Sequence, residues 1–171
     1  MNDVEKSESE QWLYANAPGF SKLPDRDRRA IFDFSFLWSL FEAQVMDNFA
    51  QARTISEQVN GWDTEHRIHS EVYAEALAYF RSRYSLNGQT THHYDYLNLR
   101  GSDYPELVGR VIRGESDDPR DSMLCVLMII WRLRNNLFHG SKWAYQIRDQ
   151  VDNFTHANAV LMKVLERYGR L

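Results

Sequence analysis

Four side chains with complementary chemistry occur within six residues of the chain: Arg134, Asn135, Asn136 and His139. An unperturbed imidazole has a pKa near ~6.5, so it can accept or donate a proton at neutral pH. A guanidinium is always charged there and can bind an anion through two parallel hydrogen bonds. Together with the two amides, these groups suit a reaction in which a proton moves and negative charge develops on an anion.

The spacing predicts how these residues lie on a helix. At 100° per residue, Arg132, Asn135, Asn136 and His139 share one polar stripe. Arg134 lies about 140° from His139 around an unbroken helix. Bringing both to one anion therefore needs an extended arginine side chain, a distorted last turn or a second copy of the helix. A separate apolar stripe is predicted to face the core and consists of Val126, Ile130, Leu133 and Leu137.

The segment that carries these residues is the most apolar part of the chain and is predicted to be a helix over residues 119–139. Pro119 suits its first turn, and Gly140 suits a left-handed C-cap. A last amphipathic helix is expected from near Ile147 to Tyr168. Its apolar face consists of Val151, Phe154, Ala157, Leu161, Val164 and Leu165.

The N-terminal half is predicted to hold two more long helices. The first opens at Pro24 and continues through Phe49, with one apolar stripe of Ile31, Phe34, Trp38, Phe41, Val45 and Phe49. Asn60-Gly61 is expected to break this pattern, and Trp62-Asp63-Thr64 to cap a second helix. That helix is expected to turn inward Ile68, Val72, Leu77, Phe80 and Tyr84.

These elements predict an all-α, antiparallel helical bundle of about five helices. Residues 85–103 are interpreted as an exposed connection, which a short helix with Leu107 and Val111 follows. Residues 1–22 are expected to form a flexible or short helical N-terminal segment, and residues 23–171 the domain itself. The helical segments show no internal repeat and no sustained strand alternation.

Composition and charge are typical of an intracellular globular protein. The chain of 171 residues is 43% hydrophobic, which is enough for a core, and its single Cys125 is interpreted as a core residue. The acidic start does not resemble an export signal, and the longest apolar run, 123–130, is too short to span a bilayer. We therefore expect a cytoplasmic protein without a membrane partner. The net charge is −4, but residues 119–171 hold eight basic and four acidic residues, so an anion is expected to bind there.

Arg134-Asn135, three further residues and His139-Gly140 resemble the Arg-x4–6-His signature of the HEPN superfamily of small helical domains. The aromatic-rich segment 36–43 resembles an early helix of these domains, and segment 136–142 is similar to a common HEPN variant. The resemblance covers roughly residues 25–170. It implies a HEPN-like bundle and an endoribonuclease that needs neither a metal nor another cofactor.

The resemblance also implies roles for individual residues. His139 would transfer the proton, Arg134 would stabilise the phosphorane, and Asn135 would orient the phosphate or fix the imidazole tautomer. Further contacts with RNA would come from Arg132, Asn136 and Lys142. The 2′-hydroxyl of RNA would attack its own phosphodiester, so DNA would not be cleaved.

The family setting implies partners as well. Two copies would form a homodimer in which the motif helices meet at one composite cleft, so that Arg134 of one chain approaches His139 of the other. Glu42 would support this site by pairing with an arginine of the motif. A toxin–antitoxin or antiviral context, with an antitoxin protein as a partner, is also implied.

Three other interpretations stay open. HEPN domains include non-catalytic modules for dimerisation, nucleotide binding or partner binding. The motif could also be purely architectural in a generic helical regulator, because basic residues and glycine are common at helix C-termini. A metal at His66 and His69, or at His92-His93 with Asp95, is a weaker interpretation because no third ligand of suitable spacing accompanies the first pair.

Overall fold

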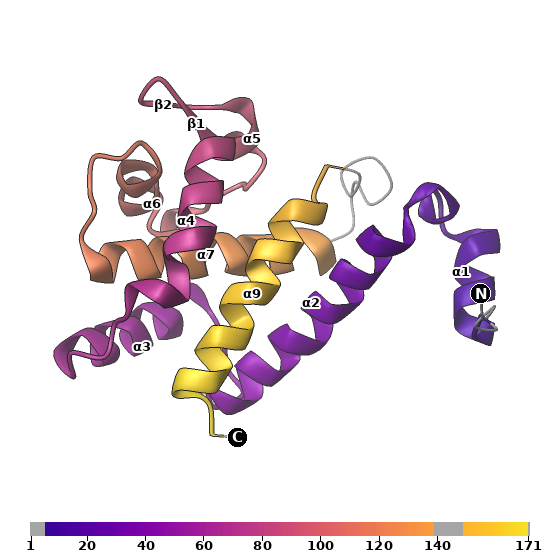
Figure 1. Ribbon diagram of the computed structural model, residues 1–171, viewed down its shortest axis with the longest axis horizontal. Coiled ribbons are helices and arrows are strands. Elements are labelled where there is room, and N and C mark those ends of the chain that lie inside the picture. The colour runs from indigo at the N-terminus through magenta and orange to yellow at the C-terminus, as the bar shows by residue number, and fades with distance from the viewer. Residues whose placement is uncertain (1–5, 139–148, 171) are drawn as a thin grey trace.

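The computed structural model describes residues 6–138 and 149–170, and it confirms the prediction of an all-α fold (Figure 1). The only strands in these ranges are β1 (Ser85–Leu86) and β2 (Gln89–Thr90), each of two residues, which pair as a short antiparallel hairpin. The long helices are α2 (Asp25–Gln44), α3 (Ala52–Thr64), α4 (Ser70–Tyr84), α7 (Pro119–Phe138) and α9 (Val151–Tyr168). The shorter helices are α1 (Glu8–Asn16), η1 (Phe20–Lys22), α5 (His92–Asp95), η2 (Gly101–Asp103) and α6 (Pro105–Ile112).

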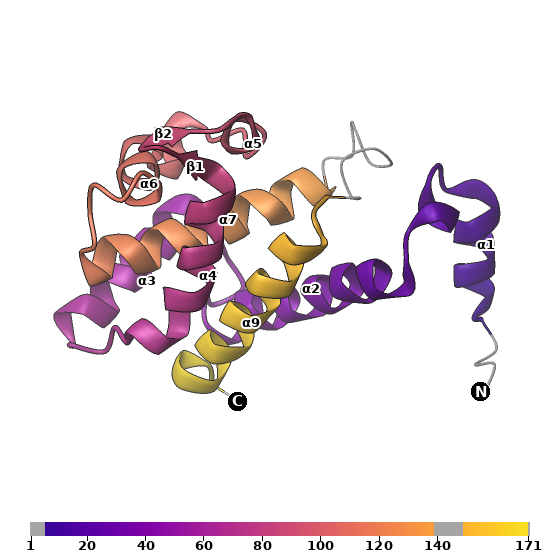
Figure 2. The same ribbon diagram turned by 45° about the horizontal axis from the view of Figure 1, so that its top comes forward.

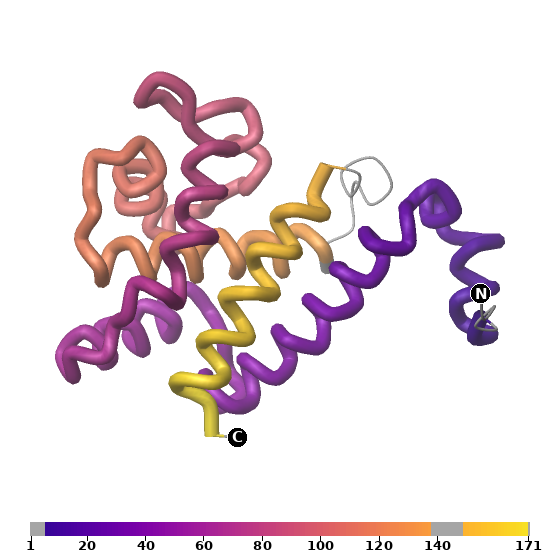
Figure 3. The backbone as a smooth tube through the Cα atoms, in the orientation of Figure 1, coloured from indigo at the N-terminus to yellow at the C-terminus, as the bar shows by residue number. Residues whose placement is uncertain are grey.

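Helices α2 and α9 lie side by side and run in the same direction (Figures 1 and 3). Near the start of α2, Asn158 Nδ2 donates a hydrogen bond of 2.9 Å to Ala30 O. Beyond the other end, Arg170 N donates a hydrogen bond of 3.3 Å to Gln44 O. The contact points advance together along both helices, so the two helices are parallel.

Helix α4 packs against the other side of α9 in the opposite direction. Tyr79 Oη lies 3.0 Å from Asn153 Oδ1, and Lys163 Nζ lies 3.7 Å from Glu75 Oε2. The predicted inward residues of α9 are all buried, as are Val72, Leu77, Phe80 and Tyr84 of α4. The bundle therefore combines one parallel and one antiparallel packing around its last helix.

Helix α7 crosses the middle of this arrangement and has neighbours on several sides (Figure 2). Each residue from Met123 to Ile130 is buried, which explains why the sequence there is continuously apolar rather than amphipathic. The Cys125 thiol is fully buried, and this burial raises its pKa. The prediction that Cys125 is a core residue is confirmed.

Helix α2 ends one turn earlier than predicted. It stops at Gln44, and Asp47 and Asn48 adopt left-handed backbone conformations, which aspartate and asparagine tolerate better than most residues. Glu42 stabilises the turn that follows, since its carbonyl accepts from Asn48 N at 2.8 Å and its Oε1 accepts from Ala50 N at 3.2 Å. The inclusion of Phe49 in the apolar stripe was wrong, because this side chain is 60% exposed.

The break predicted at Asn60-Gly61 was also wrong, because both residues lie inside α3. A glycine in a helix costs about 1 kcal/mol, but burying a large aromatic side chain next to it gains more. That side chain is Trp62, which is buried and stacks on Tyr168 with ring centroids 3.9 Å apart. The true break follows Thr64, so His66 and His69 lie in the turn between α3 and α4 and not on one helix.

The N-terminal helix α1 lies apart from the main bundle, near the start of α2 (Figures 1 and 2). It is attached through a small cluster in which Phe20 and Leu23 are buried and Tyr14 packs edge-on against Phe20. Within the described part of the chain, no helix combines the length and the apolar character needed to cross a bilayer.

Candidate functional site

The described part of the motif lies in the last two turns of α7. Arg132, Arg134, Asn135 and Asn136 lie within the described residues, all upstream of Phe138, the last residue described for α7. His139 and Lys142 come after Phe138 in the sequence and lie outside the described residues. The structure therefore describes the guanidinium and amide groups of the candidate site.

Arg134 and Asn135 are joined to each other and to a pair of indole rings. Arg134 Nη1 donates to Asn135 Oδ1 at 3.2 Å. Its Cζ atom lies 6.0 Å from the ring centroid of Trp38 and 5.8 Å from that of Trp131, within the range of cation–π attraction. Asn135 is buried and Arg134 is half-buried. These contacts hold the Arg134 guanidinium in one position, next to Asn135 and the two indole rings.

Arg132 belongs to a buried ion pair. Its Nη1 atom lies 3.3 Å from Asp103 Oδ2, and each side chain is only 3% exposed. Its Nε donates to Leu97 O at 3.1 Å. Burial lowers the pKa of Arg132, Asp103 opposes this effect, and the charge of the neighbouring Arg100 adds to it. The Arg132 guanidinium thus holds η2 and the segment before it against α7, a structural task that the sequence did not predict.

Asn136 takes part in the same attachment. Its Nδ2 lies 3.2 Å from both Tyr96 O and Leu97 O, and its Oδ1 accepts from Arg132 Nη2 at 3.4 Å. Most side chains of the connection 85–103 are exposed, but Leu97 and Asp103 are buried where these bonds form. The connection is therefore fixed to the polar side of α7 at a defined position.

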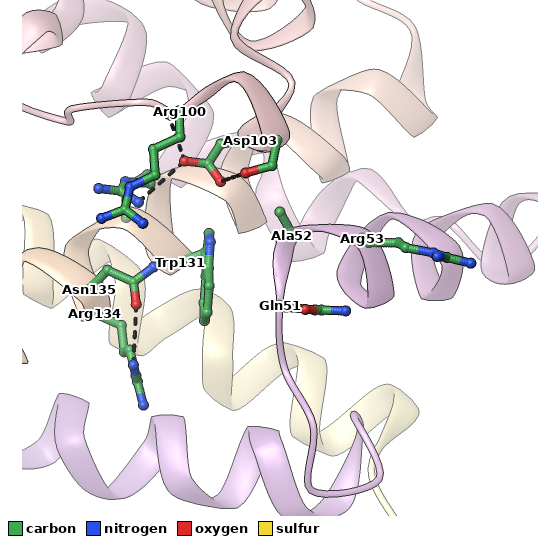
Figure 4. A pocket seen from close by; sticks show the side chains of 10 residues that line it. Gln51, Ala52, Arg53, Arg100, Asp103, Trp131, Arg134 and Asn135 are labelled. Atoms are coloured by element: carbon green, nitrogen blue, oxygen red, sulfur yellow. Dashed lines mark hydrogen bonds and ion pairs between the residues drawn. The ribbon is translucent and has the colours of Figure 1, made fainter.

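A pocket of about 390 Å³ lies beside these residues. Figure 4 shows Arg100, Asn135 and Arg134 on one side of the Trp131 ring, and Gln51 and Ala52 on the other. The pocket is lined by the start of α3, the segment through η2 and one side of α7, namely by Gln51, Ala52, Arg53, Arg100, Ser102, Asp103, Trp131, Arg132, Arg134 and Asn135.

Positive charge exceeds negative charge in this pocket, because its lining includes four arginines and one aspartate. Asp103 is already occupied, since it pairs with Arg132 and accepts a hydrogen bond of 2.8 Å from Arg100 N. Arg53 points away toward Glu57 (Figure 4), with Nε to Oε1 at 2.8 Å, and both side chains are largely exposed, so this pair is weak. The pocket suits an anion.

Only Arg132, Arg134 and Asn135 of the lining residues were predicted as site residues from the sequence; among those that were not are Arg53, Arg100 and Trp131. Arg53 and Arg100 come from segments far from the motif, and Arg100-Gly101 carries only the pattern of a turn. The spacing of the residues in 134–139 contains no signal for these contacts, because they arise when α3 packs on α7 and Asp103 of η2 pairs with Arg132.

Glu42 lies near the C-terminal end of α2, and its Oε1 accepts a hydrogen bond from Ala50 N. Ala50 directly precedes the pocket residues Gln51 and Ala52. The Glu42 carboxylate thus supports the turn that leads into the pocket wall. The pairing of Glu42 with a motif arginine stays a prediction.

The histidines considered as metal ligands are placed as follows. His92 and His93 lie in α5 with ring centroids 3.9 Å apart, and burial with the charge of Arg83 lowers the pKa of His93. Across residues 6–138 and 149–170, no three histidine, cysteine, aspartate or glutamate side chains gather closely enough to hold a metal ion.

Comparisons of the chain with protein-family models, with curated proteins and with solved structures found no match.

Proposed function

We propose that this chain is a metal-independent endoribonuclease of HEPN type, acting in a toxin–antitoxin or antiviral defence context. The chemistry would be carried out by His139, Arg134 and Asn135, beside a pocket that receives the RNA backbone. The observation that supports the proposal best is the position of Arg134 and Asn135 in the wall of an arginine-rich pocket. The net charge of the chain is −4, so this local excess of positive charge is not a general property of its surface.

The proposed reaction is an internal transesterification. The imidazole of His139 removes the proton of a ribose 2′-hydroxyl, and the 2′-oxygen forms a bond to the adjacent phosphorus. Arg134 neutralises the charge that develops on the equatorial oxygens. The bond from phosphorus to the 5′-oxygen breaks as that oxygen takes up a proton from water, and His139 returns its proton to the solvent. The products are a 2′,3′-cyclic phosphate and a 5′-hydroxyl end.

The test is to incubate the purified chain with a mixed RNA pool in excess EDTA and to identify the chemistry of the new ends. Cyclic-phosphate ends from the unmodified chain, absent with His139→Ala and Arg134→Ala, are the expected result. DNA of the same sequences should stay intact, since it has no 2′-hydroxyl. An unchanged RNA pool, or equal cleavage by all three proteins, would contradict the proposal.

The second candidate is a non-catalytic HEPN module that binds a nucleotide or a partner protein. The observation in its favour is that Arg132 and Asn136 serve the attachment of residues 96–103, which leaves fewer motif side chains for a substrate. This candidate predicts RNA or nucleotide binding in the pocket without cleavage, and expression of the unmodified chain without toxicity.

A homodimer is part of the proposal, and the outer face of α2 is the surface we assign to a second copy. Phe32, Phe36 and Leu40 follow one another at four-residue spacing, and all three are exposed. Such a contiguous apolar stripe is unusual on a monomer surface. The exposed residues beside this stripe include Arg29 and Asp33, whose charges are opposite in sign. Two copies that meet at this face therefore do not bring together an excess of one sign of charge. The opposite face of the same helix carries Trp38, against which Arg134 packs, so a contact through the outer face would keep the two motif helices apart. The composite cleft that the resemblance implies would need a different contact between the two copies.

We expect Phe36→Glu to convert a dimer into a monomer. Phe36 is 76% exposed at the centre of the stripe, so the substitution should leave the fold intact. A central apolar contact in an interface contributes about 2 kcal/mol or more to binding. Its loss should therefore raise the Kd of the dimer at least about thirtyfold. Light scattering coupled to gel filtration, over a range of protein concentrations, measures this change.

The matched control is Met162→Glu, which introduces the same charge at a 47% exposed apolar residue of α9. The control variant should keep the mass of the unmodified chain at each concentration. A monomeric unmodified chain, or an equal effect of both substitutions, would remove the α2 face as the dimer surface.

A further inference from the structure

One aromatic ring in the pocket has no role in the proposed proton transfer. Trp131 lines the pocket and is half-buried, whereas Trp38 and Trp62 are almost completely buried. A tryptophan at the edge of a charged pocket leaves part of a large flat surface open to a ligand. Such a surface can stack a nucleobase, because every base has a flat π-face.

The Trp131 ring is held firmly in place. Its centroid lies 5.8 Å from that of Trp38, with the two planes inclined by 36°, and the Arg134 guanidinium lies against it. Contacts of this kind reduce the rotamer freedom of the ring before a ligand arrives. A fixed ring loses little conformational entropy on binding, so its stacking energy goes into affinity.

Positive charge lies on the side of the ring where Arg100 and Arg134 are found (Figure 4). Arg100 is exposed and extends from the segment that Asp103 fixes to α7. A guanidinium next to an aromatic ring is the combination that recognises a phosphate attached to a base. The pocket volume of about 390 Å³ falls in the lower range of small-molecule sites, which suits one nucleotide.

We propose that the pocket binds one nucleotide of single-stranded RNA, with its base stacked on Trp131 and its phosphate held by Arg100. This inference rests on the proposed function for the identity of the ligand as RNA, and it adds the substrate class. A paired base in a duplex is covered on both faces by its neighbours, so it cannot stack on the indole. The pocket therefore selects unpaired strands.

The experiment uses the full chain with His139→Ala, so that the probe stays intact, and measures binding by fluorescence anisotropy. The probes are a short single-stranded oligoribonucleotide, the same sequence as a duplex, and an abasic ribose-phosphate strand of equal length. The added substitutions are Trp131→Leu, Trp131→Phe and Arg100→Gln. Trp12→Leu is the matched control, since Trp12 is a 62% exposed residue of the distant helix α1.

We expect Trp131→Leu to weaken binding of the single strand about ten- to a hundredfold. Trp131→Phe should retain much of the affinity because it keeps an aromatic face. Binding of the abasic strand should be weaker at the outset and unchanged by Trp131→Leu, whereas Arg100→Gln should weaken both strands. Arg100 is exposed, so its variant reports on the pocket even if Trp131→Leu fails to fold. Trp12→Leu should bind like the parent.

An equal effect of Trp131→Leu on the abasic and the base-bearing strands would overturn the stacking role. Equal affinity for the duplex and the single strand would overturn the selection of unpaired RNA. Adenosine 5′-monophosphate is added as a separate probe, and binding as tight as that of the strand would assign the pocket to a free nucleotide.

The two proposals fail in different ways. If the unmodified chain cuts RNA and Trp131→Leu cuts it with unchanged KM and kcat, the stacking site is wrong and the ribonuclease stands. If single strands bind through Trp131 and no cleavage occurs with the unmodified chain, the stacking site stands and the ribonuclease is wrong.

Discussion

His139→Ala should lower the rate of RNA cleavage by roughly 10²- to 10⁴-fold, the usual contribution of one general acid–base group. In the proposed reaction the 2′-hydroxyl is a poor nucleophile until its proton is removed, and alanine removes the only group assigned to that step. Binding should change little, because the phosphate contacts are assigned to arginines. Single-turnover cleavage of an end-labelled single strand, with enzyme in excess, measures the chemical step directly.

The matched control is His92→Ala, which removes an exposed imidazole from α5 and should cleave at the rate of the unmodified chain. The pH dependence gives a second readout. An imidazole with a pKa near ~6.5 makes the rate vary between about pH 5 and 8, and the residual activity of the alanine variant should lack this dependence. If the His139→Ala variant cleaves RNA at the full rate, and this activity elutes with the variant protein on two successive columns, His139 is excluded as the base.

Asp103→Ala should reduce the free energy of unfolding by about 3–5 kcal/mol, the cost of leaving one member of a buried ion pair alone. Arg132 and Asp103 are each 3% exposed, so water cannot replace the lost carboxylate. The same change removes the acceptor of Arg100 N. For a chain of this size the melting temperature should fall by roughly 6–20 °C, measurable by circular dichroism.

Glu75→Ala is the control for this effect. Its carboxylate pairs with Lys163 at 3.7 Å but is 73% exposed, so its loss should cost no more than about 1 kcal/mol. The double variant Arg132→Met with Asp103→Leu should recover much of the stability, because apolar residues of similar volume can replace a buried pair. Equal stability of Asp103→Ala and Glu75→Ala would show that the buried pair contributes little.

The helices could largely be predicted because their apolar residues recur at helical spacing. The core faces of α4 and α9 follow directly from this periodicity, and the start of α7 at Pro119 follows from the preference of proline for the first turn of a helix. The errors occurred where tertiary contacts outweigh local preference. Gly61 stays helical because Trp62 is buried against Tyr168, and α2 ends early because Glu42 stabilises the turn that follows it.

The candidate site was only partly predictable. The motif indicated α7 and the type of anion chemistry, but helical spacing treats Arg132, Asn135 and Asn136 as one solvent-facing stripe. In the structure residues 97–103 pack on this side of α7, and Arg132 pairs there with the buried carboxylate of Asp103. The pocket residues Arg53 and Arg100 come from elements whose packing cannot be derived from any single stretch of sequence.

The parallel pairing of α2 with α9 also determines when the domain can form. The bond from Asn158 to Ala30 joins residues separated by 128 positions, so the core side of α2 has no α9 partner until α9 itself has been synthesised. Contacts of this range close slowly and leave apolar surface open to aggregation in the meantime. During translation, we therefore expect Phe34, which packs on Phe154 of α9, to stay without this contact until α9 leaves the ribosome.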